Sequence, residues 1–177
     1  TKDSGIEWIG EIPNHWETKK LKYIIDNLSS GVSVNAEDSP VEDESEYGVL
    51  KTSCVYGNVF RFAENKKVFS EEYGRVKCPV KGNSIIISRM NTPDLVGSSG
   101  YVEKDHDNLF LPDRLWITEF KEVSSLCVKW ISYILRSSRF KKVLSNLSTG
   151  TSSSMKNITQ DDLLSVKIPL CKFEEQV

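Results

Sequence analysis

Two carboxylates and a lysine in the middle of the chain have the order that metal-dependent phosphodiester cleavage needs. Pro93-Asp94 and Pro112-Asp113 both precede Glu119-Phe120-Lys121, which gives the pattern P-D…E-x-K. An aspartate and Glu119 would hold Mg²⁺ through their oxygens, and the ion would activate a water molecule for attack on phosphorus. The spacing therefore indicates a Mg²⁺-dependent nuclease as one candidate function.

Local features of the sequence weaken the nuclease interpretation. Five residues separate Asp113 from Glu119, which leaves little room for a hairpin that would bring the two together. Asp94 follows a Thr-Pro pair, where an aspartate is expected for turn formation alone. A domain like the PD-(D/E)xK nucleases is therefore the alternative function only, and we expect no catalytic residue and no metal site in this chain.

Other catalytic arrangements are missing from the sequence. The two histidines, His15 and His106, have no convincing catalytic or metal-binding partner beside them. The sequence contains no phosphate loop of the G-x-G-x-x-G or G-x-x-x-x-G-K-[ST] kind, and no G-x-S-x-G nucleophile elbow. We therefore expect a binding protein that carries no cofactor of its own.

A run of small residues late in the chain has the chemistry of a nucleic-acid contact. Small side chains let backbone N–H groups approach phosphates, hydroxyls add neutral donors, and the Lys-Asn pair that follows adds a charge and a bidentate amide. On composition alone, the same stretch is equally typical of a flexible connector. The candidate DNA-binding residues here are Thr149, Gly150, Thr151, Ser152, Ser153, Lys156 and Asn157.

Two further groups have similar chemistry. The apolar run Ile85 to Ile87 predicts a buried strand whose end delivers polar residues to a loop, where Arg suits guanine and Asn suits adenine. Each good bidentate contact of this kind contributes about 1–3 kcal/mol of discrimination. The candidates are Arg89, Asn91 and Thr92 after this strand and, on a weaker argument, Lys51, Thr52 and Ser53.

Charge is divided unevenly along the chain, although the whole carries a net charge of only −2. Residues 1–60 have a net charge of −6, with a loop-like acidic stretch at 37–46, whereas residues 121–160 have a net charge of +6. Such a division can present a basic face to phosphates, although a solvated helix face would look the same. The basic candidates are Arg136, Arg139, Lys141 and Lys142.

Hydrophobic periodicity predicts both helices and strands. We expect one long helix over 125–147, capped by a serine pair, and a short helix opened by Thr159 with Asp162 three residues later. A short helix is expected near 21–25, a hairpin turn at Gly57-Asn58, and a helix start at the last five residues. Strands are expected in "GNSIIISRMN", "GSSGYVEK", "DRLWITEF" and "SVKIPL".

Composition sets the class of protein. The chain has 177 residues, of which 38% are hydrophobic, so one globular domain with a sizeable core is expected. Its four cysteines are far apart and form no C-x-x-C pair, which favours reduced thiols over disulfides or zinc. The sequence contains no long apolar run, so we expect a cytoplasmic protein with no membrane partner.

Several stretches resemble the specificity subunits of type I restriction-modification systems. The opening "SGIEWIGEIPNHW" is similar to the family signature S-G-(I/V)-x-W-(I/L)-G-x-I-P-x-H-W. "YGVLKTSCVYGN", "DRLWI" and the hydroxyl run followed by "KNI" are similar to further family features. The ending "KIPLCKFEEQ" resembles the junction I-P-(L/P)-P-x-x-E-Q but has fewer prolines before Glu174.

The resemblance implies a fold and a function. It implies a mixed α/β (α+β) fold with a twisted, mainly antiparallel sheet and a few helices. Residues 1–170 would form a target recognition domain, and residues 171–177 would begin a connecting helix that is truncated here. The domain would lack catalysis and would read one half of a bipartite target in double-stranded DNA.

The resemblance also implies partners and cofactors. DNA adenine methyltransferase (modification) subunits and a restriction or motor subunit would assemble with the domain. S-adenosylmethionine, ATP and Mg²⁺ would belong to those partners. The basic helix would position the DNA by its phosphates, and the loops would specify bases.

Overall fold

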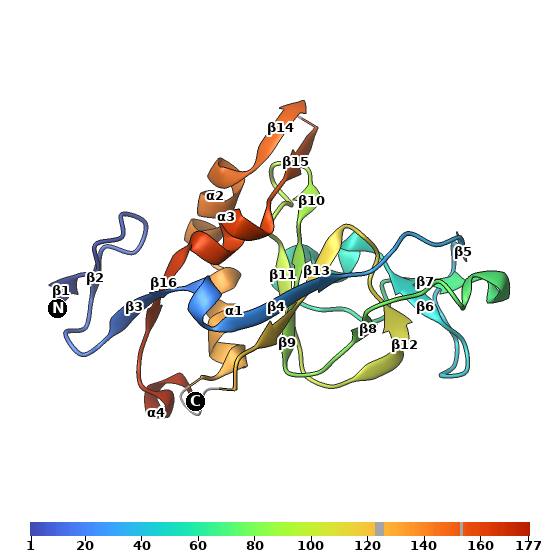
Figure 1. Ribbon diagram of the computed structural model, residues 1–177, viewed down its shortest axis with the longest axis horizontal. Helices are drawn as coiled ribbons and strands as arrows, with labels where there is room; N and C mark the ends of the chain where they lie inside the picture. The colour runs from blue at the N-terminus through green and yellow to red at the C-terminus, as the bar shows by residue number, and fades with distance from the viewer. Residues whose placement is uncertain (123–125, 153) are drawn as a thin grey trace.

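A four-stranded antiparallel sheet with the order β11-β9-β13-β4 lies at the centre of the structure (Figure 1). The structure, a computed structural model, describes residues 1–122, 126–152 and 154–177. The four strands are β4 (Ile25–Ser30), β9 (Ser84–Ser88), β11 (Ser99–Val102) and β13 (Leu115–Phe120). Three of them coincide with the strands predicted at "SIIIS", "SGYV" and "LWITEF", which confirms those predictions.

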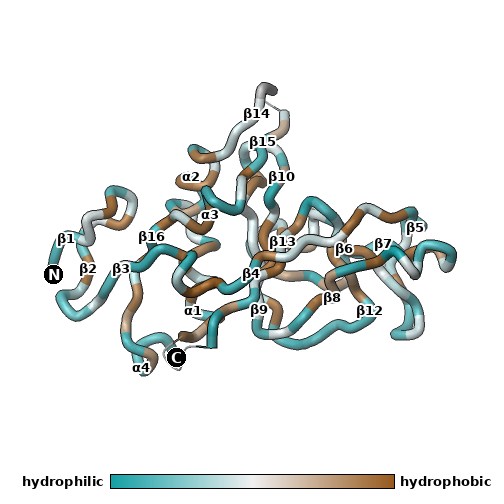
Figure 2. The backbone as a smooth tube through the Cα atoms, viewed as in Figure 1, coloured by the Kyte–Doolittle hydropathy of each residue, from teal (hydrophilic) through white to brown (hydrophobic). Residues whose placement is uncertain are grey.

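Both faces of this central sheet are buried. Side chains alternate along a strand, so Ile85 and Ile87 enter one apolar cluster while Ile86 enters a second. On β13, Trp116 belongs to the first cluster and its neighbour Ile117 to the second. Figure 2 shows hydrophobic residues concentrated where β13 crosses the centre of the molecule. The run of three isoleucines thus follows from burial on two sides.

Helices cover one face of the central sheet and a second sheet covers the other (Figure 1). The second sheet has the order β5-β7-β6-β12-β8 and contains one parallel pair, β6 with β12. The fold is therefore mixed α/β and mainly antiparallel, as predicted. Its strands are β5 (Ala36–Glu37), β6 (Gly48–Leu50), β7 (Asn65–Val68), β8 (Pro79–Val80) and β12 (His106–Phe110). The helices are α1 (Val128–Leu135), α2 (Ser138–Leu147) and α3 (Gln160–Ser165).

Strands from the two ends of the sequence pair with each other. Strand β3 (Glu17–Lys20) is antiparallel to β16 (Lys167–Leu170), and we call this pair the terminal clasp. Beside it lie β1 (Lys2–Asp3), β2 (Glu11–Ile12) and the short helix α4 (Phe173–Gln176).

A carboxylate of α4 ties the two ends together further. Glu175 binds His15 Nε2 at 2.9 Å and accepts a hydrogen bond from Trp16 Nε1 at 3.2 Å. The hydrogen bond from His15, followed by that from Trp16, lowers the pKa of Glu175 below its usual value. The clasp therefore holds together residues some 150 positions apart, since Lys20 pairs with Lys167.

The long helix predicted over 125–147 is two helices. Helix α1 ends at Leu135, and α2 begins after Ser137, whose hydroxyl accepts a hydrogen bond from the backbone N–H of Phe140. A serine that caps a new helix competes with continuation of the old one, and the break lets both helices bury apolar faces in the first cluster. The predicted cap at Ser124-Ser125 falls outside the described residues, and α1 follows Cys127 without a side-chain cap.

Other local predictions were wrong in informative ways. The stretch after α2 is a β-hairpin rather than a loop, formed by β14 (Thr149–Ser152) and β15 (Met155–Asn157). Gly57 and Asn58 end a 3₁₀ segment, η2 (Thr52–Asn58), and their positive φ angles of 76° and 59° close it without forming a hairpin turn. The helix near 21–25 is a single 3₁₀ turn, η1 (Leu21–Tyr23), and η3 (Ser70–Glu72) is another.

Several predictions for the second half of the chain hold. Helix α3 is capped by Thr159, whose hydroxyl accepts a hydrogen bond from the backbone N–H of Asp162 at 3.1 Å. Strand β16 and helix α4 lie where "KIPL" and the last residues predict them. The four cysteines are free thiols. Among the helices of the described residues, none has the length and apolar character needed to cross a membrane.

Because α2 begins at a serine cap, replacing Ser137 and replacing Ser138 should lower the stability of the domain by different amounts. Ser137→Ala removes the cap hydrogen bond to Phe140 and should lower the free energy of unfolding by about 1 kcal/mol. Ser138→Ala changes the exposed first residue of α2 and should stay within about 0.5 kcal/mol of the wild type. Urea denaturation of both variants measures the difference, and equal losses would contradict the capping role.

Candidate nucleic-acid interface

A three-stranded sheet with the order β10-β15-β14 brings together two groups of candidate residues. Strand β10 (Met90–Asn91) pairs with β15 so that Asn91 lies opposite Lys156 and Met90 lies opposite Asn157. The backbone N–H of Ile158 also donates to the carbonyl oxygen of Arg89 at 2.9 Å. The β14–β15 hairpin projects beyond the body of the molecule (Figure 1). Residues some 65 positions apart thus form one surface element.

Gly150 has a structural role inside this hairpin. A Cβ atom at position 150 would lie 2.3 Å from the backbone oxygen of Met155, which is closer than any real contact. The glycine therefore lets β14 approach β15. The sequence interpretation, in which small residues serve an approach to phosphates, did not include this role. Ser153 and the side chains of Thr151 and Ser152 lie outside what the structure describes.

The third candidate group lies beside the second. The hydroxyl of Tyr56, in η2, is hydrogen-bonded to Thr52 Oγ1 at 3.2 Å and accepts a hydrogen bond from Asn91 Nδ2 at 3.0 Å. Tyr56 thereby joins η2 to β10. The sequence analysis did not select this tyrosine, because its importance depends on a contact between segments 35 residues apart.

Two members of the third group are engaged within the protein. Lys51 Nζ lies 3.4 Å from Glu64 Oε2, and the Ser53 hydroxyl donates to the same oxygen at 2.5 Å. The hydrogen bond from Ser53, followed by the charge of Lys51, lowers the pKa of Glu64. A DNA phosphate would have to compete with this carboxylate for either side chain. Lys51 and Ser53 are thus weaker candidates than their residue types suggest.

After strand β9, the side chain of Asn91 is engaged inside the protein, whereas that of Arg89 is available to a ligand. Asn91 is 8% exposed, its Nδ2 donates to Tyr56 and Ser88, and its Oδ1 accepts the Thr92 N–H at 2.8 Å. Its amide thus organises the strand end. Arg89 donates from Nε to the Asp113 carbonyl oxygen at 2.6 Å, and its two terminal nitrogens make no hydrogen bond to any described residue. Arg89 can therefore still present its guanidinium edge to a ligand.

The side chain of Asn157 contains a hydrogen-bond acceptor without a partner among the described residues. Its Oδ1 is buried and has no hydrogen-bond partner within the described ranges. A buried acceptor without a partner costs about 1–3 kcal/mol, so such groups in native proteins usually have a reason. The neighbouring Lys156 is half-buried and forms no ion pair with any described carboxylate. The Lys156-Asn157 pair is the part of the hairpin best suited to a polar ligand.

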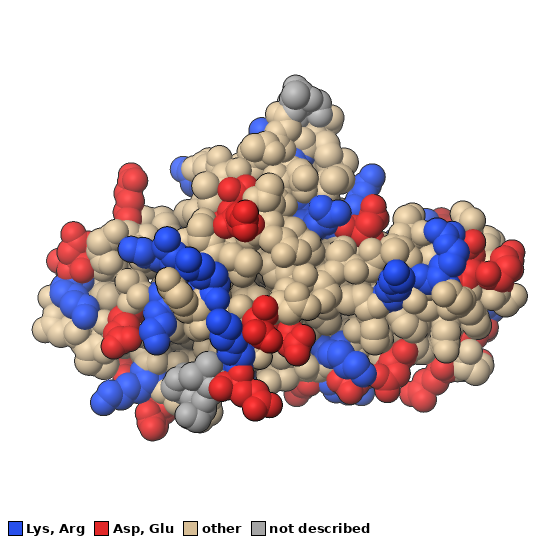
Figure 3. All heavy atoms as spheres, in the orientation of Figure 1, with Lys and Arg blue, Asp and Glu red and all other residues tan. Residues whose placement is uncertain are grey.

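The basic residues of α1 and α2 lie next to the strand-end turn. Lys141 Nζ contacts the carbonyl oxygen of Asp94 at 3.4 Å, and Ser145 Oγ donates to that of Pro93 at 3.4 Å. Arg139 and Lys142 are exposed, and the Arg136 guanidinium lies 4.4 Å from the centre of the Tyr133 ring. Figure 3 shows Lys and Arg side chains around the base of the projecting hairpin. The helix cations and the hairpin thus flank the same turn.

Two neighbouring hollows connect these cations to η2. Both are lined by Asn58 and Arg136, and the larger one, of about 360 Å³, also contains Lys141 and Lys142. Asn58 was not predicted as a site residue. Its positive φ angle and its Oδ1, which accepts the Ser99 N–H at 3.4 Å, fix it at the rim of this groove.

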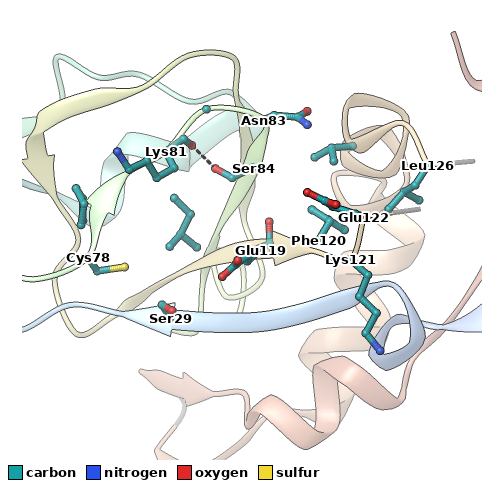
Figure 4. A pocket seen from close by; sticks show the side chains of 15 residues that line it. Ser29, Cys78, Lys81, Asn83, Ser84, Glu119, Phe120, Lys121, Glu122 and Leu126 are labelled. Atoms are coloured by element: carbon teal, nitrogen blue, oxygen red, sulfur yellow. Dashed lines mark hydrogen bonds between the residues drawn. The ribbon is translucent and has the colours of Figure 1, made fainter. Parts of the chain in front are cut away.

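The residues of the nuclease alternative do not form a site. Glu119 and Lys121 both line a cavity of about 680 Å³, but the ammonium end of Lys121 extends away from Glu119 and donates to the carbonyl oxygen of Lys22 at 3.4 Å (Figure 4). Asp113 precedes the other end of β13, roughly 20 Å away at 3.3 Å per residue. Asp94 lies in the turn beside Lys141. No three acidic, histidine or cysteine side chains within the described ranges are grouped for a metal ion.

Comparison with known proteins gives the family. Residues 13–177 match the family described as Type I restriction modification DNA specificity domain. The chain belongs to this family. The resemblance to the specificity subunits of type I restriction-modification systems is thereby confirmed.

Curated relatives of this specificity domain are longer than the chain. It is 31% identical over 161 residues to the EcoEI specificity subunit of Escherichia coli, covering 90% of the chain and 27% of that protein. It is 32% identical over 174 residues to the MjaVIII specificity subunit of Methanocaldococcus jannaschii, covering 95% of the chain and 38% of that protein. The chain thus spans about a third of the length of these relatives.

Solved structures share the fold of the specificity domain. The S subunit from M. genitalium matches with a TM-score of 0.59 and 17% identity, over 94% of this chain and 38% of that one. The HsdS subunit from Thermoanaerobacter tengcongensis matches with a TM-score of 0.56 and 20% identity, over 94% and 36%. A chain from a study of type I R-M complex assembly matches with a TM-score of 0.62 and 19% identity, over 94% and 37%.

The hydrogen bonds of the Tyr56 hydroxyl should contribute measurably to stability, because they connect η2 to β10. Tyr56→Phe removes the partner of Thr52 and of Asn91 and should lower the free energy of unfolding by about 1–2 kcal/mol. Tyr133→Phe is the matched control, since that ring is 48% exposed and its hydroxyl has no hydrogen-bond partner among the described residues. Chemical denaturation of both variants tests the link, which is refuted if the two variants are equally stable.

Proposed function

We propose that this specificity domain binds double-stranded DNA and reads part of the target sequence of a type I restriction-modification complex, without catalysis of its own. The observation that carries the proposal is the β10-β15-β14 sheet, which presents Arg89, Lys156 and Asn157 on a projecting element beside the cations of α2. Membership of the DNA specificity family supports it. The separation of Asp94, Asp113 and Glu119 argues against the nuclease alternative.

The shape of the hairpin suits one groove of the duplex. A two-stranded ribbon fits the major groove of B-DNA, which is about 12 Å wide and displays a different pattern of donors and acceptors for each base pair. The free edge of the Arg89 guanidinium suits guanine O6 and N7, and the amide of Asn157 suits adenine N6 and N7 once a rotation of the side chain exposes its buried Oδ1. We assign base contacts to these two side chains.

The helix cations suit a different part of the DNA. Lys and Arg bind phosphate oxygens regardless of sequence, and such contacts fix the position of a protein on the duplex. Arg136, Arg139, Lys141 and Lys142 flank the turn that leads into β10, so phosphates bound there would place the hairpin at the groove edge. The residues that position the DNA would thus lie next to those that recognise its bases.

The proposal extends to partners. The curated relatives are specificity subunits of type I restriction enzymes, and the chain matches only part of each. We infer that the domain reads one half of a bipartite target in the cytoplasm and directs DNA adenine methyltransferase subunits and a restriction or motor subunit. S-adenosylmethionine, ATP and Mg²⁺ would act in those subunits.

The phosphate role of α2 predicts a loss of affinity that is independent of sequence. Lys141→Ala and Lys142→Ala should each weaken binding to cognate and scrambled duplexes alike and reduce the slope of log K against log salt by about 0.9. Fluorescence anisotropy of the assembled methyltransferase at several salt concentrations measures this slope. A loss restricted to the cognate duplex would show that these lysines contact bases instead.

The base-reading role of the hairpin predicts the opposite pattern. Arg89→Ala and Asn157→Ala should each reduce discrimination at one base pair, by about 1–3 kcal/mol, and leave binding to scrambled DNA unchanged. Methylated adenines mapped in the host genome, with wild-type and variant protein, report the change in sequence preference. An unchanged methylation pattern in both variants would refute the assignment of base contacts.

A plasmid assay separates the nuclease alternative from the proposal. The purified chain should leave plasmid DNA intact in the presence of Mg²⁺, because Glu119 and Lys121 share no site with Asp94 or Asp113. Cleavage that Glu119→Ala abolishes would contradict the proposed function.

A further inference from the structure

A second group of cations lies on the terminal clasp, away from the hairpin. Figure 3 shows it as a stripe of Lys and Arg side chains across the region of β3, β16 and η1. The sequence analysis did not detect this group, because its members come from three separate segments of the chain. We call it the clasp lysine patch, which consists of Lys19, Lys20, Lys22, Lys121 and Lys167, together with the ring of Tyr23.

The register of the clasp places two positive charges opposite each other. Lys20 on β3 is the direct partner of Lys167 on β16, so their side chains project from the same face of the two-stranded sheet. Like charges directly opposite on adjacent strands destabilise a sheet. None of the carboxylates in the described ranges forms an ion pair with either lysine. The domain thus bears an electrostatic cost that an external anion would relieve.

An exposed aromatic ring extends the patch. Tyr23 is 59% exposed, and Lys22 Nζ lies 5.0 Å from the centre of its ring. Lys19, Lys20, Tyr23 and Lys167 line one surface hollow. Lys121 reaches the edge of η1 through its contact with the carbonyl oxygen of Lys22. The patch is therefore continuous from the clasp to the end of β13.

The patch is distinct from the candidate interface on the hairpin. Helix α3 packs on η1 and lies between the clasp and β15, and its first turn carries Asp161 and Asp162. Figure 3 shows acidic side chains over this helix. An anion on the clasp lysine patch would therefore occupy a separate place from one bound beside α2.

The composition of the patch favours a nucleic acid over a protein partner. The cores of protein–protein interfaces are depleted in lysine and enriched in arginine, whereas this patch contains five lysines and no arginine. Lysine ammonium groups act as mobile point charges, which suits phosphates whose positions do not depend on base sequence. From these observations we infer that the clasp lysine patch binds the phosphate backbone of duplex DNA outside the segment read by the hairpin. This inference rests on the proposed function.

The test uses the full-length protein assembled with its methyltransferase partners and the sequence that the host methylation map defines. Two duplexes are compared, one ending at the recognition sequence and one with flanks of about 20 base pairs on each side. Lys20→Gln with Lys167→Gln should lower affinity for the flanked duplex about tenfold and its salt slope by about 2, with the short duplex unaffected. The matched control replaces Lys77 and Lys104, two exposed lysines outside the patch, by glutamine.

Two further measurements keep the test independent of folding. The glutamine variant should unfold at the same temperature as the wild type or above it, because the like-charge pair is gone. Lys20→Arg with Lys167→Arg retains both charges and should retain binding to the flanked duplex. A glutamine variant that binds both duplexes normally overturns the inference, and so does an equal loss in the control.

The remaining outcomes distinguish this inference from the proposed function. If the glutamine variant no longer assembles with the methyltransferase subunits, whereas the Lys77 and Lys104 control does, the patch contacts an acidic protein surface and the inference is wrong. Loss of base preference in Arg89→Ala would still support the proposed function in that case. If neither set of variants alters DNA binding, the proposed function itself fails.

Discussion

Burial of both faces of the central sheet is the constraint on which the rest of the structure depends. The side chains of β9 alternate between two apolar clusters, so Ile86 needs the second sheet to cover it while Ile85 and Ile87 need the helices. Truncating a residue buried in this way costs about 2–5 kcal/mol. Because the sheet is occupied on both sides, ligand-binding groups have to lie at the ends of its strands. Arg89 and β10 continue the chain directly from β9, so the same strand anchors the core and leads into the candidate interface.

The candidate interface is held together by polar contacts and not by a further apolar cluster. Tyr56 joins η2 to Asn91, Asn91 shapes the strand end, and β10 then pairs with β15. Tyr56 and Asn91 contribute by holding the neighbouring backbone segments in place. Arg89 and Asn157 keep hydrogen-bonding groups that the protein does not use. A rigid frame that leaves the end of Arg89 available at its edge suits recognition, because little backbone conformational entropy is lost on binding.

The parts of the fold that local sequence determines were predictable. The isoleucine run gave β9, and Thr159 with Asp162 gave the start of α3. The pairing of β10 with β15 could not be predicted, since it joins segments whose polar sequences resemble loops and whose partner is some 65 residues away. The break at Ser137 was missed, although Phe140 follows Leu135 by five residues and so falls out of step with the i, i+3, i+4 spacing of α1. Likewise, the residue type of Asn91 suggested a base contact, but only the fold shows that Tyr56 and Ser88 occupy its amide.

The geometry of the terminal clasp has a mechanical consequence. Glu17 pairs with Leu170 at the open end of the ladder and Lys20 with Lys167 at the closed end. A force applied through the residues before Glu17 and after Leu170 would act along the inter-strand hydrogen bonds, which lie perpendicular to the strands. The bonds would then break one after another, as in unzipping, instead of sharing the load as they do in shear. Under tension the contacts of Glu175 with His15 and Trp16 would break and the clasp would open next, while the hairpin lies outside the path of the force.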